Sequence, residues 1–514
     1  ILYILILFSF SILFIQYVGF IGINPIDSFF SFNSGYDILN GHFPFKDFWT
    51  SIGPLIDLTQ AFFFKLFGVS WFSYVLHASI FNAIFVISTF YTLYKLNLNL
   101  NYCFLYAFSL SILAYPSSGT PYVDHQASYM SLIAIYCFIL GMKTNLNFYW
   151  FILPIIFGLS FLAKQTPTGH IFLITSVLSL VYFSFNFDIK KIINIFLGSV
   201  TIVIAVILFL LLGKISIVSF FEQYITYPLS IGESRIEFLY PFDIKKILLR
   251  FKIIHFFSFT LIFIIIKNII NDKYFIKKND FLSMLLLIFS SFALIAHQLM
   301  TINGLYIFFV IPILAGFAHI YSIKYSIGKK YILYLFITIT LVSSAHYGNK
   351  YILSRDFADL RNININKAVN ANILDSKLNG LKWITPLYPN DPNKELELLN
   401  NVINIIKKDK RQKVIITDYQ FISVILGILD NSPNQVWFIN HMLNQDKNSK
   451  FFKIYKKFLI EKLKVNEIEI IYIVKPLWGG DIFAKSLNNS CFKKIKVTKI
   501  LDTYLIQQCE DLKN

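Results

Sequence analysis

The chain has 514 residues, of which 56% are hydrophobic, 18% aromatic and only 15% charged. An average soluble domain carries about 25% charged residues, so this composition excludes an ordinary soluble protein and predicts a polytopic membrane protein. The formal charge of +17 does not predict a nucleic-acid partner, because much of the lysine lies in short clusters between apolar runs, where the positive-inside rule places it.

Apolar runs recur along the first two thirds of the chain. A helix needs about 20 residues to cross a hydrocarbon core ~30 Å thick, and most of the runs approach that length. We therefore predict about eleven transmembrane helices, at 1–21, 70–94, 101–116, 126–142, 147–163, 171–187, 192–213, 251–271, 280–298, 302–322 and 330–346.

Basic residues predict which loops face the cytoplasm. Every second loop carries lysines, namely Lys95, Lys143, Lys190 with Lys191, and those within 267–278 and 324–330. This alternation is the cytoplasmic pattern. The first loop, the loop at Asp124, the turn at 164–170, the long loop 214–250 and the chain after residue 347 then face the other side.

The stretch 24–68 follows the first apolar segment and predicts two short surface helices at a membrane face. Pro25 suits a first helical turn, where its missing N–H is not needed, and Gly41 and Gly68 stand where helices stop. Its polar groups are few but concentrated, at Asp27, Asp37, His42, Lys46, Asp47 and Asp57. A carboxylate just beyond a transmembrane helix can meet both water and a lipid head group. Asp27 is therefore the first catalytic candidate, and helix capping is its alternative role.

Beyond residue 347 charged residues become frequent. Helical patterns at 394–408 and 448–464 alternate with strand-like runs at 413–417, 468–474 and 495–503. This alternation is typical of a small α/β domain. We predict a transmembrane domain over 1–346 and an extracytoplasmic α/β domain over 347–514. A disulfide between Cys491 and Cys509 is plausible there if the compartment is oxidising.

Ionisable residues at the edge of a membrane are costly and are therefore functional candidates. The topology gathers them on the outer side, at Asp27, Asp47, Asp57, Asp124, His125, Lys164, Gln165, His170, Glu222, Arg235 and His297. Lys164 ends an apolar helix, so its ammonium can reach a phosphate or snorkel to water as an anchor. Arg235 can pair with a phosphate or with a neighbouring glutamate. Asp124 is also placed to cap the next helix, and His170 and His297 fit a helix-bundle core.

The first loop resembles that of the GT-C superfamily of polyprenyl-phosphate-sugar glycosyltransferases, near bacterial relatives of the protein O-mannosyltransferases and the aminoarabinose transferase. The resemblance rests on Asn24-Pro25-Ile26-Asp27, on the run Gly35 to Trp49 with its turn Gly41-His42-Phe43-Pro44-Phe45-Lys46-Asp47, and on Gly53-Pro54-Leu55 and Leu66-Phe67-Gly68. The stretch 158–165 is similar to a segment common in the same proteins. The layout matches over 1–346, and the last 160 or so residues carry no matching motif.

The resemblance implies an inverting transfer of a sugar from a polyprenyl phosphate to an acceptor hydroxyl on a lipid, glycan or protein. Asp27 matches the catalytic base, and Asp124, the second residue assigned to catalysis, loosely matches a second acidic position. Lys164 and Arg235 would stabilise the leaving phosphate. We assign His42, Lys46, Asp47, His125 and Gln165 to the loops that contact substrate. The implied location is the bacterial inner (plasma) membrane, with the site outside the cytoplasm.

The same residues also bear on other functions and on cofactors. No CxxC, HExxH, Walker or GxGxxG motif occurs, which argues against a cytosolic nucleotide-driven enzyme. Without a dense carboxylate cluster we expect no cofactor, although a divalent metal stays possible. A transporter or flippase would carry ionisable residues in mid-helix, whereas these lie at one face. A polymerase of lipid-linked glycans would share the donor and the compartment.

Overall fold

The computed structural model describes all residues except 116–118, 231–243, 302–306, 328–329, 356–359, 362, 438–449, 478–486, 488 and 508–514. It divides into two compact units. The helical unit comprises Ile1–Val18, Ala78–Ile207 and Arg235–Arg361, and the mixed unit comprises Gly19–His77, Leu208–Ser234 and Asn362–Asn514. The predicted boundary between residues 346 and 347 stays a prediction.

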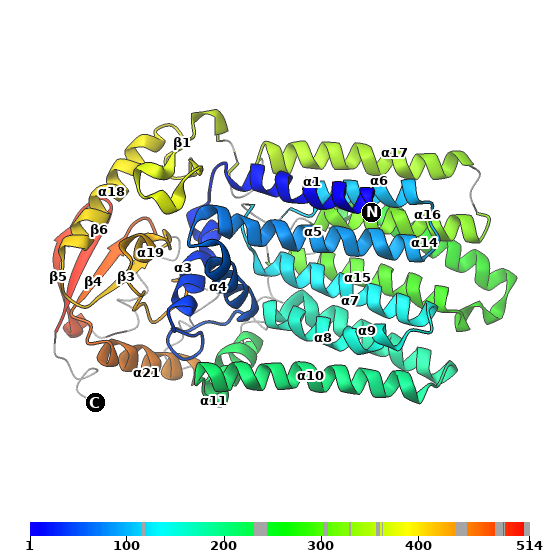
Figure 1. Cartoon of the computed structure of the whole chain (residues 1–514), viewed down its shortest axis with the longest axis horizontal. Helices are drawn as coiled ribbons and strands as arrows, with labels where there is room; N and C mark the ends of the chain where they lie inside the picture. Colours follow the sequence, from blue (N-terminus) through cyan, green and yellow to red (C-terminus); the bar gives the residue numbers. More distant parts are fainter. Residues whose placement is uncertain are drawn as a thin grey trace. The chain divides into compact units, whose positions relative to one another are not determined.

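Each of the eleven predicted apolar segments forms a helix. They are α1 (Leu2–Gly19), α5 (Trp71–Lys95), α6 (Leu100–Leu113), α7 (Val123–Lys143), α8 (Asn147–Ala163), α9 (Gln165–Phe185), α10 (Ile189–Gly213), α14 (Lys252–Asn271), α15 (Asn279–Thr301), α16 (Val310–Lys324) and α17 (Lys330–Tyr347), with α13 (Ile244–Arg250) before α14. Among the described residues, nine helical spans are long and apolar enough to cross a membrane, and α6 and α8 are shorter. Helices α6 to α9 and α14 to α17 run side by side (Figure 1).

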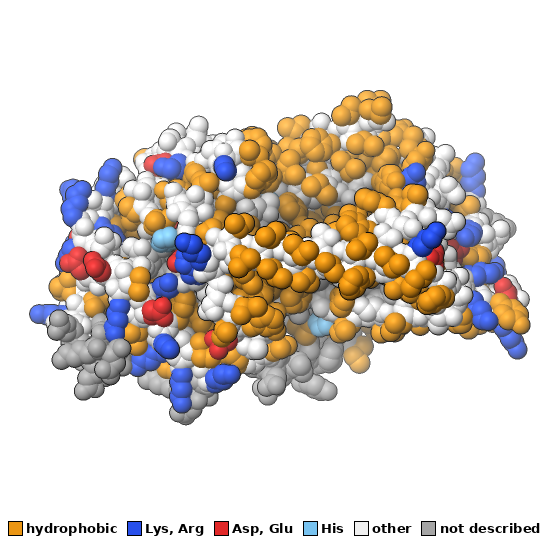
Figure 2. All heavy atoms as spheres, turned by 60° about the horizontal axis from the view of Figure 1, so that its bottom comes forward, with side chains coloured by type: hydrophobic (Ala, Val, Ile, Leu, Met, Phe, Trp, Pro, Cys, Tyr) orange, Lys and Arg blue, Asp and Glu red, His pale blue; other side chains and the backbone are white. Residues whose placement is uncertain are grey.

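The outer faces of these helices are apolar. On α10, Leu211 and Leu212 expose 68% and 80% of their surface. Hydrophobic side chains lie along the helices, and Lys and Arg gather near helix ends (Figure 2). Exposed apolar surface on this scale marks contact with lipid or protein. The chain is therefore a multi-pass membrane protein, as its composition predicts.

The lysines predicted to face the cytoplasm lie at helix ends. Lys95 and Lys143 end α5 and α7, Lys190 and Lys191 begin α10, and Lys324 ends α16. The loops that carry these lysines alternate along the chain. The positive-inside rule can therefore be applied to the observed helices in the same way as to the predicted ones. The side of the membrane that each loop faces stays a prediction.

The first loop, in the mixed unit, contains the two expected helices. They are α3 (Phe30–Leu39) and α4 (Leu55–Phe67), preceded by a single turn, α2 (Pro25–Ser28). Gly41 and Gly68 follow the two helices with φ of +93° and +81°, a conformation that favours glycine. A Cβ atom on Gly35 would lie 2.7 Å from Cγ of Gln60, so α3 and α4 pack closely. Their predicted place at a membrane face stays a prediction.

The C-terminal part of the mixed unit is an α/β structure. Its four-stranded sheet has the order β3-β4-β6-β5, with β3 parallel to β4 and the other pairs antiparallel. The elements are β1 (Val369–Asn370), β2 (Lys382–Trp383), α18 (Pro392–Lys408), β3 (Lys413–Thr417), α19 (Ile422–Leu426), α21 (Lys450–Val465), β4 (Ile470–Val474), β5 (Phe492–Val497) and β6 (Leu501–Ile506); α11 (Ile217–Phe220) also belongs to this unit. The sheet confirms the predicted α/β region.

One strand prediction was wrong. The run 495–503, predicted as a single strand, contains the turn between β5 and β6. Thr498 closes this turn, because its hydroxyl accepts the Leu501 N–H at 2.8 Å and its own N–H donates to the Leu501 carbonyl at 2.9 Å. β-branched residues continue through the turn, so the sequence pattern predicted one strand where the structure has two. Cys491, just before β5, is disulfide-bonded, and Cys509 lies outside the described residues.

Within the mixed unit the first loop pairs with the segment after α19. The Trp49 N–H donates to the Pro433 carbonyl at 2.8 Å, and the Gln435 N–H donates to the Trp49 carbonyl at 3.0 Å. The Trp49 indole is 2% exposed and packs edge-on against Tyr227 and Tyr455. The aromatic residues of the loop therefore form part of a hydrophobic core shared with the C-terminal segment.

Candidate active site

Three side chains predicted to lie on the outer side meet inside the helical unit. The Lys164 ammonium donates to both carboxylate oxygens of Asp124, at 2.7 and 2.8 Å. Nε2 of His297 lies 2.6 Å from Asp124 Oδ1. The side chains of Asp124 and His297 are each 1% exposed and that of Lys164 is 14% exposed. The cluster is a buried carboxylate held between an ammonium and an imidazole, and Lys164 is its member nearest to solvent.

Helix ends bring these residues together. Asp124 lies in the first turn of α7, where the helix dipole favours a negative charge. Lys164 has extended φ and ψ between α8 and α9, and Thr166 is non-helical as well. A residue before proline avoids helical geometry, so Pro167 accounts for the second break. His297 lies near the end of α15, which packs against both α7 and α9.

Polar atoms beside this cluster lack protein partners in the part of the chain that the structure describes. Neither ring nitrogen of His125 has a hydrogen-bond partner there, nor does either amide atom of Gln298 or Nδ1 of His297. His125 and Gln298 are 1% and 4% exposed. Buried polar groups are normally hydrogen-bonded, so these side chains are available to a bound polar group or to water. His170 has an unpartnered Nδ1 as well, and Gln165 begins α9 directly after Lys164.

Asp27 belongs to the mixed unit, where it is half-buried in α2. The side-chain amide of Asn24 donates to its Oδ2 at 3.0 Å, and the Asp27 N–H donates to the Asn24 carbonyl at 3.1 Å. Asn24 occupies the capping position before the turn, so Asp27 is not the N-cap residue of α2. The Asn24 amide therefore orients the Asp27 carboxylate within this turn.

The three other candidates of the first loop lie close together after α3. Asp47 accepts the Phe43 N–H at 2.8 Å and lies 3.5 Å from Lys46 and 3.7 Å from Lys462. Burial lowers the pKa of His42. Asp47 is therefore engaged in closing its own turn and in holding α21. Arg235, the second predicted phosphate ligand, lies outside the described residues.

Two carboxylates that pair in the mixed unit were not predicted to do so. The Asp430 N–H donates to Asp37 Oδ1 at 3.1 Å. The Asn33 amide donates to both side chains, 3.1 Å from Asp37 and 2.8 Å from Asp430. Burial raises the pKa of both residues, and for Asp37 the neighbouring carboxylate adds to the rise. The sequence marked Asp37 as a polar residue of the loop, but nothing in it pointed to Asp430.

Asp57, in the first turn of α4, is a third buried carboxylate of the mixed unit. Asp57 accepts from Ser34 Oγ at 2.7 Å and from the Gln435 amide at 2.9 Å. Burial raises its pKa to about 7. Asp37 and Asp57 therefore both bind the segment after α19. Their hydrogen bonds assign them to holding the first loop and that segment together.

His, Cys, Asp and Glu side chains are the usual ligands of a protein-bound metal ion. Among the residues outside the undescribed gaps, no group of three His, Cys, Asp or Glu side chains is close enough to hold a metal ion. Metal independence stays a prediction, because it concerns the reaction and the substrate as well as these side chains.

Comparisons with known proteins identify the fold. A scan of protein-family models and a search of curated proteins find no match to the chain. Among solved structures, ArnT from Cupriavidus metallidurans bound to undecaprenyl phosphate superposes with a TM-score of 0.51 and 11% identity, over 98% of this chain and 97% of that one. The oligosaccharyltransferase AglB of Archaeoglobus fulgidus in complex with an inhibitory peptide and a dolichol-phosphate gives 0.45 and 12%, over 92% and 69%. A further oligosaccharyltransferase structure from the same organism gives 0.43 and 11%, over 90% and 68%.

The likeness to ArnT covers nearly the whole of both chains, including the part after residue 347 where no motif matches. At 11% identity it is a statement about the fold. This chain therefore shares the fold of ArnT, as the resemblance of its first loop implies.

Proposed function

We propose that the protein is an inverting glycosyltransferase of the bacterial inner (plasma) membrane. It moves a sugar from a polyprenyl phosphate to an acceptor hydroxyl on a lipid, glycan or protein, on the extracytoplasmic face. The observation that carries the proposal is the fold shared with ArnT, a protein solved with undecaprenyl phosphate bound. The first-loop resemblance at Asp27 supports the same conclusion independently of that superposition.

The proposed reaction has one proton transfer and one displacement. The acceptor oxygen attacks C1 of the sugar while the Asp27 carboxylate accepts the hydroxyl proton. The bond between C1 and the phosphate oxygen breaks, and the lipid phosphate leaves with the bonding electrons. Attack from the face opposite the leaving group inverts the anomeric configuration. No nucleotide and no redox partner is needed.

Lys164 is proposed to stabilise the leaving phosphate. Positive charge placed where negative charge develops lowers the barrier, and an ammonium suits a phosphate oxygen. Lys164 has the solvent-facing position of the buried cluster, and both Asp124 oxygens hold its ammonium in place. Asp124 acts here as a positioning residue, and His297 fixes Asp124 in turn. Arg235 is proposed as the second phosphate ligand.

Substrate contacts are proposed for the other predicted residues. His125 carries two unpartnered ring nitrogens within the described part of the helical unit, so it can bind a sugar hydroxyl or a phosphate oxygen. Gln165 follows Lys164 directly. In the first loop, His42, Lys46 and Asp47 form the turn after α3. We propose that the reaction needs no metal ion.

The test is sugar transfer by the purified protein from a set of polyprenyl-phosphate sugars. Asp27→Asn should bind the donor and lose at least about a hundredfold in turnover, as expected when a general base is removed. Glu397→Gln, which removes an exposed carboxylate on α18, is the matched control and should keep full activity. The product should have inverted anomeric configuration. If Asp27→Asn works as well as the wild type, the proposed base is wrong; movement of intact donor across a vesicle membrane without transfer would instead support a flippase.

A further inference from the structure

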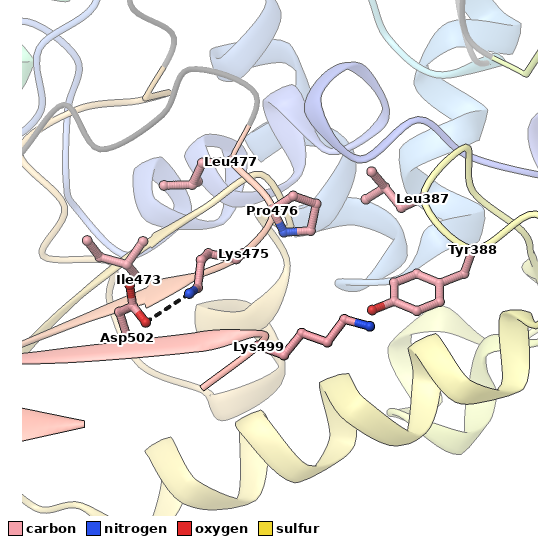
Figure 3. A pocket seen from close by; sticks show the side chains of 8 residues that line it. All are labelled: Leu387, Tyr388, Ile473, Lys475, Pro476, Leu477, Lys499 and Asp502. Atoms are coloured by element: carbon pink, nitrogen blue, oxygen red, sulfur yellow. Dashed lines mark ion pairs between the residues drawn. The ribbon is translucent and has the colours of Figure 1, made fainter. Parts of the chain in front are cut away.

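A cavity of about 560 Å³ opens in the mixed unit beside the end of β4 (Figure 3). Its volume is in the range of small-molecule sites, which run from about 300 to 1,000 Å³. The walls come from three places in the sequence: the segment before α18, the end of β4, and the turn between β5 and β6. None of the residues assigned to the proposed reaction lines this cavity.

The cavity contains one ion pair and one further ammonium. Lys475 lies 2.9 Å from Asp502 Oδ1, and Lys494 reaches the other oxygen of Asp502 at 3.5 Å. The Lys475 ammonium also donates to the Thr498 carbonyl at 2.9 Å. Lys499 forms no ion pair with any residue that the structure describes. Two lysines and one aspartate therefore leave the cavity lining with a net positive charge.

Lys499 and Tyr388 line the cavity together. Figure 3 shows the Lys499 ammonium extended toward the Tyr388 hydroxyl on the opposite wall. An anion between these two groups would contact a cation and a hydroxyl donor together. Charge-assisted hydrogen bonds of this kind are roughly twice as strong as neutral ones.

The remaining wall is apolar and partly aromatic. The Tyr388 ring, Leu387 and Pro476 line the cavity beside the two lysines. Leu387 is 38% exposed, so the wall includes uncovered apolar surface. The C–H faces of a sugar ring pack on such surfaces, while a tyrosine keeps its hydroxyl for a polar contact. A small free anion would use the lysines and leave this wall empty.

We propose that the cavity binds an anionic saccharide, a sugar ring that carries one phosphate or one carboxylate. The anion lies between Lys499 and Tyr388, and the ring packs on Leu387, Pro476 and the Tyr388 ring. The cavity is a binding site and not a site of chemistry. It recognises the anionic sugar of an acidic glycan or of a glycolipid head group, and its existence does not depend on the proposed transfer reaction.

The experiment uses the full-length protein in detergent and measures binding by calorimetry and by ligand-observed NMR. The probes are glucose 6-phosphate, glucuronic acid, glucose and inorganic phosphate. We expect saturable binding of the two anionic sugars, weakened by added salt, and much weaker binding of glucose and of phosphate alone. The two anionic sugars also distinguish a phosphate-bearing source from a carboxylate-bearing one.

Variants locate the site. Lys499→Gln should weaken the binding of both anionic sugars at least about fivefold, since it removes a charged hydrogen bond from an exposed position. Tyr388→Ala should weaken it similarly. Lys496→Gln, which removes an exposed lysine of β5 that does not line the cavity, is the matched control and should bind like the wild type. A melting curve checks that each variant is folded.

Three results would overturn the proposal. No saturable binding of either anionic sugar excludes the site. Equal losses in Lys499→Gln and Lys496→Gln would show that binding follows total charge and not this cavity. Phosphate binding as tight as glucose 6-phosphate binding would exclude the role of the ring. None of these readings depends on turnover, so a failure here is separate from a failure of the proposed transferase activity.

Discussion

The buried pair of Lys164 and Asp124 allows a test that separates the effect of Lys164 on stability from its effect on substrate binding. Lys164→Met removes the ammonium and keeps most of the side-chain volume. The Asp124 carboxylate, 1% exposed, then retains only the His297 contact among those described at its oxygens. Removing one partner of a buried ion pair costs about 3–5 kcal/mol. Because Lys164 is itself 14% exposed, we expect the lower end, about 3 kcal/mol.

A double variant tests the cause of that loss. In Lys164→Met with Asp124→Asn the uncompensated charge is gone, so most of the lost stability should return. Lys278→Met is the matched control: Lys278 lies 3.0 Å from Asp272, and the two side chains are 52% and 41% exposed. Its loss should cost at most about 1 kcal/mol, as for surface pairs. The readouts are the midpoint of thermal unfolding in detergent and the fraction of monodisperse protein.

The same double variant then reports on function. If Lys164 holds the donor phosphate, the folded double variant should lose affinity for undecaprenyl phosphate at least about tenfold, and Lys278→Met should not. A single Lys164→Met variant as stable as the wild type would refute the argument from buried charge. A double variant that is less stable than the single one would do the same, and unchanged affinity would assign Lys164 a purely structural role.

Three further predictions concern the mixed unit. The pKa of Asp57 is raised to about 7 in the folded state, from about 3.9 in the unfolded state, so the folded state binds this proton more tightly. Protonated Asp57 therefore contributes on the order of 4 kcal/mol to the free energy of unfolding. This contribution is fully present below about pH 4 and is lost as the pH rises to about 7. Asp57→Asn should therefore flatten the fall in unfolding midpoint between pH 5 and pH 8, and an unchanged slope would contradict the assignment. Gly35→Ala should lower stability by about 1–3 kcal/mol, because its Cβ would lie 2.7 Å from Cγ of buried Gln60; Gly169→Ala, with nothing within 4 Å of its Cβ, is the control in the same melts. Glu395→Ala should destabilise the protein by about 2–4 kcal/mol, because it leaves three buried side-chain donors without the carboxylate that accepts their hydrogen bonds. Glu395→Gln should recover part of this lost stability, and denaturant titrations measure both variants.

Local features of the chain predicted its helices well. The apolar runs and the basic residues between them are read from neighbouring residues and from the thickness of a bilayer, without any tertiary contact. All eleven runs form helices. Pro25 begins a helical turn, and Gly41 and Gly68 follow α3 and α4 with positive φ. The resemblance of the first loop predicted the fold that ArnT shares. The hairpin of β5 and β6 was missed because its turn is closed by one Thr498 hydroxyl and carries no glycine.

The pairing of distant residues was decided only by the tertiary structure. Asp124, Lys164 and His297 were each named as candidates, but their contact requires α7, α15 and the break before α9 to converge. Asp37 and Asp430 are separated by 393 positions, and no local pattern couples such residues. Local sequence patterns determine where helices begin and end and where polar residues replace apolar ones. These features depend on short-range sterics and on solvation. Which charge neutralises which depends on packing, because burial makes an unpaired charge too costly to keep.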